Sequence, residues 1–145
     1  MYPSSHVLIV VSALLLFVQL GLYMGKHEEA LVQYQKALEV FLAVYGQEAM
    51  SVADTYNNMA IVYKSQGHYE RALEYYQKSL DIKMKVVGHD HIDVAASYTN
   101  IAGVYQKEGK RAQANEMATK AYDINLKVLG PDHPRTRQLK SFLGK

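Results

Sequence analysis

The sequence of 145 residues repeats itself with a 42-residue period. Two sets of three glycines have this spacing: Gly25, Gly67 and Gly109, and Gly46, Gly88 and Gly130. When residues 25–66 are laid over residues 67–108, 17 of the 42 pairs are identical, whereas segments of ordinary composition would share about two or three. Such a period indicates a stack of similar units, each of which buries its apolar face against the next one.

Each unit has the pattern of two helices. Within residues 50–65, apolar residues recur at three- and four-residue spacing, which is the period of an amphipathic helix: Val52, Tyr56, Met59, Ala60 and Tyr63. Gly67 then offers a residue that tolerates positive φ, and a second helix is predicted from Tyr69 to just before Gly88. No strand-like alternation occurs in the sequence. The chain is therefore predicted to be all-helical and built by stacking helical hairpins.

We call the first and second helices of each hairpin A and B. Residues 1–24 are an apolar helix, and residues 25–66 hold helix B of repeat 1 and helix A of repeat 2. Residues 67–108 hold helix B of repeat 2 and helix A of repeat 3. Residues 109–145 hold helix B of repeat 3 and a short basic C-terminal helix. The expected architecture is about two and a half repeats plus the N-terminal apolar helix.

A signature within this pattern resembles the tetratricopeptide repeat. It reads Tyr56-x2-Met59-Ala60-x2-Tyr63-x3-Gly67-x-Tyr69-x2-Ala72-x3-Tyr76. The 42-residue period and the sequence LGPDHP at 129–134 are similar to the longer variant found in kinesin light chains and related scaffold proteins, and the likeness covers residues 25–134. The resemblance implies a helical-hairpin solenoid wound into a right-handed superhelix, whose A helices line a concave face.

Composition excludes several classes of protein. Apolar residues make up 49% and charged residues 21% of the chain, so the whole chain is not disordered. Cysteine is absent, which excludes disulfides, thiolate metal sites and cysteine nucleophiles. Residues 1–108 carry 8 Lys and Arg against 11 Asp and Glu, whereas residues 109–145 carry 8 against 3. The C-terminal end is therefore basic on a mildly acidic body.

The sequence carries no recognisable catalytic motif. It has no phosphate-binding glycine loop, no nucleophile elbow and no metalloprotease helix. His89-x-His91 with Asp90 or Asp93 imitates a metal site, but the third copy keeps only His133. Helix capping and turn roles explain these residues better. We expect no enzyme activity, no metal and no cofactor.

Residues 1–24 lack the repeat pattern, although by spacing they should include helix A of repeat 1. No side chain from Met1 to Gly25 carries a formal charge, and the only clearly polar members of residues 7–24 are Ser12 and Gln19. A helix of 18 residues is about 27 Å long, close to the thickness of a bilayer core. Three interpretations stay open: a membrane or signal anchor, a degenerate capping helix on residues 27–45, and a cleaved signal peptide. The capping helix would leave exposed leucines, Leu15, Leu16 and Leu22.

Polar residues of the A helices are the candidate binding site. The face opposite Tyr56, Ala60 and Tyr63 includes Asp54, Asn57, Asn58, Ile61 and Lys64, and the next repeat adds Asn100, Gln106 and Lys107. An asparagine offers a donor and an acceptor, so it can bind the backbone of a peptide. In related tetratricopeptide repeats asparagines at matching places do this, which the resemblance implies for Asn57, Asn58 and Asn100. The alternative is that they are solvated or bond within the stack.

We therefore expect an adaptor or scaffold whose concave face binds a peptide segment of a protein partner. Lys64 and Lys107 favour an acidic segment, and the expected location is the cytoplasm, with a membrane anchor through residues 7–24 left open. The alternative function is a structural module that packs on other repeat proteins or on itself, anchored by residues 7–24. Nucleic-acid binding fits poorly because the basic end is short of aromatic residues. The oligomeric state is left open.

Overall fold

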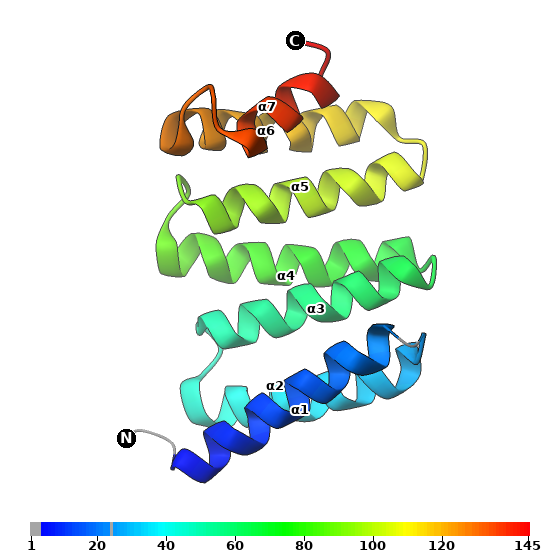
Figure 1. Ribbon diagram of the computed structural model, residues 1–145, viewed down its shortest axis with the longest axis vertical. Coiled ribbons are helices and arrows are strands. Elements are labelled where there is room, and N and C mark those ends of the chain that lie inside the picture. The colour runs from blue at the N-terminus through cyan, green and yellow to red at the C-terminus, as the bar shows by residue number, and fades with distance from the viewer. Residues whose placement is uncertain (1–3, 24) are drawn as a thin grey trace.

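The computed structural model describes residues 4–23 and 25–145 (Figure 1). These residues form helices joined by short loops, and no strand occurs among them. The seven helices are α1 (Ser5–Tyr23), α2 (His27–Tyr45), α3 (Met50–Ser65), α4 (Tyr69–Val87), α5 (Ile92–Lys107), α6 (Arg111–Leu129) and α7 (Pro134–Phe142). The predicted all-helical class is confirmed.

The helices stack in chain order, and each packs on its neighbours in sequence (Figure 1). Three hairpins, α1 with α2, α3 with α4 and α5 with α6, follow one another, and α7 closes the C-terminal end. The 42-residue period is visible in the helix bounds, since α4 and α6 begin at Tyr69 and Arg111 and end at Val87 and Leu129. The N-terminal and C-terminal ends of the described chain lie at opposite ends of the stack.

Glycines make the sharp turns between helices. Gly67, between α3 and α4, has φ of 77°, and Gly88, after α4, has φ of 85°. Residues with a Cβ rarely adopt this left-handed region, so the recurrence of glycine here follows from the backbone. The conformational role predicted for Gly67 is confirmed.

Small and large side chains alternate in the core between helices. Ala60 and Ala72 are fully buried, and the nearby tyrosines Tyr63 and Tyr76 are 8% and 1% exposed. A small residue lets two helix backbones approach closely, while an aromatic ring fills the space beside it. Tyr63 and Tyr76 thus fill the space that the small residues leave between helices.

Two histidines begin the helices that follow the inter-repeat loops. The Nδ1 atom of His91 accepts a hydrogen bond from the backbone N–H of Asp93 (3.1 Å), and His133 does the same for Arg135 (3.2 Å). These bonds satisfy N–H groups that the first turn of a helix leaves unpaired. The predicted capping role is confirmed, and among the described residues no group of three or more His, Asp or Glu could hold a metal ion.

Helix α1 occupies the place of helix A of repeat 1. It packs on α2 and buries Val11 (7% exposed) and Val18 (2%), as the capping interpretation predicts. Leu16 is 75% exposed, as predicted, but Leu15 is half-buried, and the side chain of Leu22 lies outside the described residues. Within the described part of the chain, no helix has the length and apolar character needed to cross a membrane. The membrane-spanning interpretation of residues 7–24 is thus not supported.

Candidate functional site

A cavity of about 370 Å³ opens between α5, α6 and α7. Its wall combines apolar side chains with amides and one guanidinium. The lining residues are Ile92, Ala96, Thr99, Asn100, Ala102, Gly103 and Gln106 of α5, Ala118 and Asn125 of α6, and Arg135, Gln138, Leu139 and Phe142 of α7. Two of the predicted binding residues, Asn100 and Gln106, therefore lie in one hollow. We call it the α5–α7 cavity.

Two of the predicted asparagines bond to each other. Asn100 Nδ2 on α5 donates a hydrogen bond to Asn57 Oδ1 on α3 over 3.0 Å, and both residues are half-buried. The bond joins neighbouring A helices, and each amide keeps unused hydrogen-bonding capacity. The structure thus shows bonding within the stack, which was the alternative to two free side chains facing solvent.

Lys64 of α3 reaches α5, where its charge is close enough to interact with that of Lys107. A Cβ placed on Gly103 would meet Lys64 Nζ at 3.0 Å, so the glycine leaves room for the Lys64 side chain across α5. Burial lowers the pKa of Lys64, and the charge of Lys107 lowers it further. Among the described residues neither lysine makes an ion pair. A negative group placed there would relieve this repulsion.

Asp54 was predicted to contact a bound peptide, but in the structure it pairs with Lys83 of its own hairpin. Its carboxylate lies 3.5 Å from Lys83 Nζ, and the Lys83 side chain is 8% exposed while that of Asp54 is 61% exposed. The carboxylate therefore compensates a buried ammonium of α4. Asp54 is engaged inside its own hairpin and is a weaker candidate for partner contact than the asparagines.

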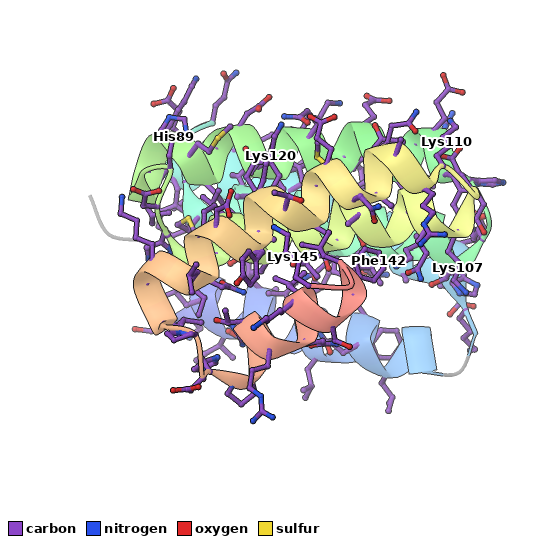
Figure 2. The ribbon with its side chains drawn as sticks, turned by 90° about the horizontal axis from the view of Figure 1, so that it is seen from above. His89, Lys107, Lys110, Lys120, Phe142 and Lys145 are labelled. Carbon is purple, nitrogen blue, oxygen red and sulfur yellow. The ribbon has the colours of Figure 1, made fainter. Side chains whose placement is uncertain are left out.

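The remaining predicted residues are spread along the A helices. Asn58 is half-buried, Ile61 is 40% exposed, and Gln106 and Lys107 are exposed. Figure 2 looks down the stack and shows Lys107 and Phe142 on the side of α7, with Lys110 on the opposite side. The structure joins Asn57 to Asn100 and places Lys64 against Gly103 of α5, whereas Lys107 does not line the α5–α7 cavity.

Sequence reasoning missed the part of the site that α7 supplies. Gln138 and Phe142 stand one full period after Ala96 and Asn100, and all four line the cavity. Extending the period by one further helix A identifies these two residues. The signal is weak because α7 is short and shares no identical residue with α5 or α3 at the 42-residue step.

Asn125 is the least expected residue of the site. It is 4% exposed, it lines the α5–α7 cavity, and its Oδ1 has no hydrogen-bond partner within the described chain. In the preceding repeat the same position is Lys83, which pairs with Asp54. The position of Asp54 is Ala96 in this repeat, so the ion pair is replaced by an amide and a small side chain beside an open space. A buried acceptor without a donor costs about 1–3 kcal/mol.

Comparison with known proteins identifies the family of the fold. A tetratricopeptide repeat family model matches residues 13–85 and 53–127. No curated protein sequence matches the chain. Among solved structures, BtubC (BKLC) from P. vanneervenii is similar with a TM-score of 0.82 and 26% identity, over 92% of this chain and 54% of that one.

Two further structures share the fold. The nearly identical repeats of a putative kinesin light chain from Podosopora anserina give a TM-score of 0.78 at 20% identity, over 92% of this chain and 63% of that one. The N-terminal domain of stress-induced protein-1 from C. elegans gives 0.66 at 18% identity, over 94% and 95% of the two chains. The chain thus spans about half to two thirds of the length of the first two structures. The family match over most of its length shows that the chain belongs to the tetratricopeptide repeat family, whose members are generally protein-interaction scaffolds, and its fold is similar to that of the kinesin-light-chain repeats.

Proposed function

We propose that the chain is an adaptor that holds an acidic peptide segment of a partner protein along its A helices, with one side chain of the peptide in the α5–α7 cavity. The observation that carries the proposal is the unpartnered Oδ1 of Asn125, buried beside that cavity. A donor group of the bound peptide would satisfy this acceptor and recover its desolvation cost.

Charge supports the acidic character of the peptide. Lys64 and Lys107 repel each other at one end of the site, and Arg135 lies exposed at the rim of the cavity. Carboxylates of the peptide would meet a cation at both ends of the site, a lysine at one end and Arg135 at the other. A basic peptide would add to the repulsion, so the site should reject it.

Hydrogen bonds to the peptide backbone would complete the site. Asn57 and Asn100 hold each other in place through their mutual bond, and their remaining amide groups are free to pair with backbone N–H and C=O groups. Because the two side chains are already fixed, less rotamer entropy is lost on binding. These hydrogen bonds would recognise the peptide backbone whatever its side chains are. Any sequence preference would then come from the α5–α7 cavity and from Lys64 and Lys107.

The test uses a peptide selected from a random display library on the full chain, titrated against variants. Replacing Asn58 and Asn100 together by alanine should weaken binding by about 1–3 kcal/mol, roughly 5- to 150-fold. Ala96→Phe should fill the α5–α7 cavity and abolish binding, whereas Ala112→Phe, at an exposed site of α6 outside the cavity lining, should not. Lys64→Gln with Lys107→Gln should weaken the salt dependence of binding.

Removing two charges elsewhere is the matched control. Lys110 and Lys120 pair with Glu108 and Glu116 respectively, so their replacement by glutamine changes the net charge equally without touching Lys64 or Lys107. The proposal is wrong if selected peptides bind the Ala96→Phe variant and the asparagine variant as tightly as the parent chain. A cytoplasmic location stays a prediction.

A further inference from the structure

Helix α7 reveals which face of an A helix receives the preceding helix B. It packs on α6, and it buries Thr136 (1% exposed) and Leu139 (7%). The equivalent positions one period earlier are Val94 and Ser97 of α5, and those two periods earlier are Val52 and Thr55 of α3. We call this side of an A helix its receiving face.

The receiving faces of α3 and α5 are closed. Each has four positions at 3-4-3 spacing that are at most 4% exposed: Val52, Thr55, Met59 and Val62 in α3, and Val94, Ser97, Ile101 and Val104 in α5. Each of these helices has a preceding helix B packed against it, α2 on α3 and α4 on α5. Burial at these positions thus depends on that neighbour.

The receiving face of α1 is open. By the same 42-residue step it consists of Val10, Ala13, Phe17 and Leu20. Val10, Phe17 and Leu20 are 58%, 62% and 61% exposed, and Ala13 is exposed as well. All four residues are apolar, whereas the buried faces of α3 and α5 each tolerate one hydroxyl residue. The most apolar receiving face of the chain is the one that no described helix covers.

The exposed apolar area is large enough for a specific contact. Ile9 and Leu16 flank the face and are 65% and 75% exposed. At about 100 Å² for each of the five large side chains of the face and its flanks, one copy exposes on the order of 500 Å², within the range for the largest patch of a monomer. Two copies would bury about 1,000 Å² in total, the area that a specific interface should reach.

The C-terminal end of the stack is a poor partner for this face. Helix α7 exposes Arg135, Arg137, Gln138 and Lys140. Packing α1 on it would strip water from three cations without supplying a carboxylate, because α1 contains no Asp or Glu. Head-to-tail stacking of copies is therefore disfavoured.

The receiving face of α1 is complementary to itself. When two copies meet antiparallel about a two-fold axis level with residue 15, Ala13 lies opposite Phe17 of the other copy and Val10 lies opposite Leu20. Each ring then meets a methyl group, and no charge is buried. A parallel pair would set Phe17 on Phe17 and leave a gap between two alanines. We propose that the open face of α1 is a homodimer interface, formed by an antiparallel pair of α1 helices.

The first test measures the mass of the full chain by analytical ultracentrifugation between about 1 and 100 µM. A dimer is expected at the upper end of this range. Phe17→Glu should raise the dimer dissociation constant at least about tenfold, because it places a carboxylate in the seam. Val128→Glu, at an apolar side chain of α6 that is 46% exposed, should leave the constant unchanged. A parent chain that is monomeric at the highest concentration would overturn the proposal.

A size swap tests the pairing itself and does not depend on adding a charge. Ala13→Phe alone sets ring on ring, and Phe17→Ala alone leaves a void, so each single variant should weaken the dimer. The double variant restores one ring against one methyl group in the antiparallel register and should dimerise as the parent does. Failure of the double variant to recover would contradict this register.

Cysteine cross-linking gives an independent readout, since the chain has no cysteine of its own. Mixing Val10→Cys with Leu20→Cys chains should yield a disulfide between the two variants. Neither variant alone should cross-link, because equal positions are about 15 Å apart in the antiparallel pair. Cross-linking of the Val10→Cys chain with itself would refute the arrangement. Monomers that float with phosphatidylcholine vesicles through α1 would overturn the dimer in favour of a lipid surface as the occupant.

Discussion

Asn100 Nδ2 donates a hydrogen bond to Asn57 Oδ1 over 3.0 Å, and this bond connects α5 to α3, two helices that are not consecutive in the chain. It joins two successive A helices on the side where the proposed peptide lies. The same bond therefore links two helices of the stack and fixes two amides that would bind the proposed peptide. Loss of either asparagine should affect both properties.

A double-mutant cycle on this pair should detect coupling. We expect Asn57→Ala and Asn100→Ala to be non-additive in the free energy of unfolding by about 0.5–1.5 kcal/mol. Asn58→Ala combined with Asn100→Ala is the control, and its effects should add. Urea denaturation of the parent and the variants measures the coupling. Additive effects of Asn57 and Asn100 would show that the bond contributes nothing to stability.

Enlarging a buried alanine should destabilise the stack. Ala60 and Ala102 are 0% and 4% exposed at equivalent positions of α3 and α5. Leucine at Ala60 forces the neighbouring helix outward, at a cost of about 1–3 kcal/mol. Leucine at Ala102, which lines the α5–α7 cavity, has space beside it and should cost less. Ala112→Leu, at an exposed position of α6, should be neutral. Thermal denaturation followed by circular dichroism checks this, and neutral behaviour of both core variants would contradict close approach of the helices there.

Stability should fall at alkaline pH because of Tyr76. Burial raises the pKa of Tyr76 to about 12 from its ordinary value of 10.0. The unfolded chain loses this phenol proton from about pH 10, while the folded chain keeps it until about pH 12. Unfolding therefore releases a proton in this window, and the free energy of unfolding falls as pH rises, by about 2–3 kcal/mol.

Tyr76→Phe isolates this contribution from other groups that titrate at the same pH. The loss of stability between pH 10 and 12 should be smaller in this variant than in the parent, whereas Tyr45→Phe, at a side chain that is 44% exposed, should follow the parent. Urea denaturation at several pH values gives the slopes. Equal slopes for the parent and Tyr76→Phe would show that Tyr76 ionises alike in both states.

The carboxylate of Asp54 should stabilise the fold only because it compensates the buried ammonium of Lys83. Asp54→Ala leaves the ammonium of Lys83 without its carboxylate, and we expect a loss of about 1–2 kcal/mol, limited by the exposure of Asp54. Adding Lys83→Met removes the buried charge at similar volume and should recover at least half of that loss. Chemical denaturation compares the three chains. A double variant that is less stable than Asp54→Ala would disprove this account.

Much of the fold could be predicted from the sequence, because the determining signals are local. The three- and four-residue spacing around Met59 and Ala60 is the period of a helix, and the glycine at Gly67 marks a turn with positive φ. The 42-residue repeat requires each hairpin to meet the next in an equivalent way. The helix predicted over 50–65 lies at those bounds in the structure, and the helix predicted from Tyr69 ends at Val87, just before Gly88.

The site was predicted less completely, because hydrogen-bond partners depend on distances between helices. Periodicity places Asn57 and Asn100 on one face, but only the placement of α3 relative to α5 decides that they bond to each other. Packing equally decides that Asp54 meets Lys83, and that Lys64 crosses Gly103. Side-chain reach is short, so a small shift between helices exchanges these partners.

Helices α1 and α7 show most clearly what the sequence determines and what only the tertiary structure decides. Sequence alone determined that residues 1–24 are apolar and uncharged, but it could not choose between a bilayer and α2 as their surroundings, since both accept apolar side chains. The tertiary structure places Val11 and Val18 of α1 against α2 and leaves the receiving face open. At the other end it folds α7 over α5 and α6, so that Phe142 of α7 and Asn125 of α6 line one cavity. Composition and period are properties of the sequence, whereas the surfaces that the described helices leave uncovered depend on how those helices pack.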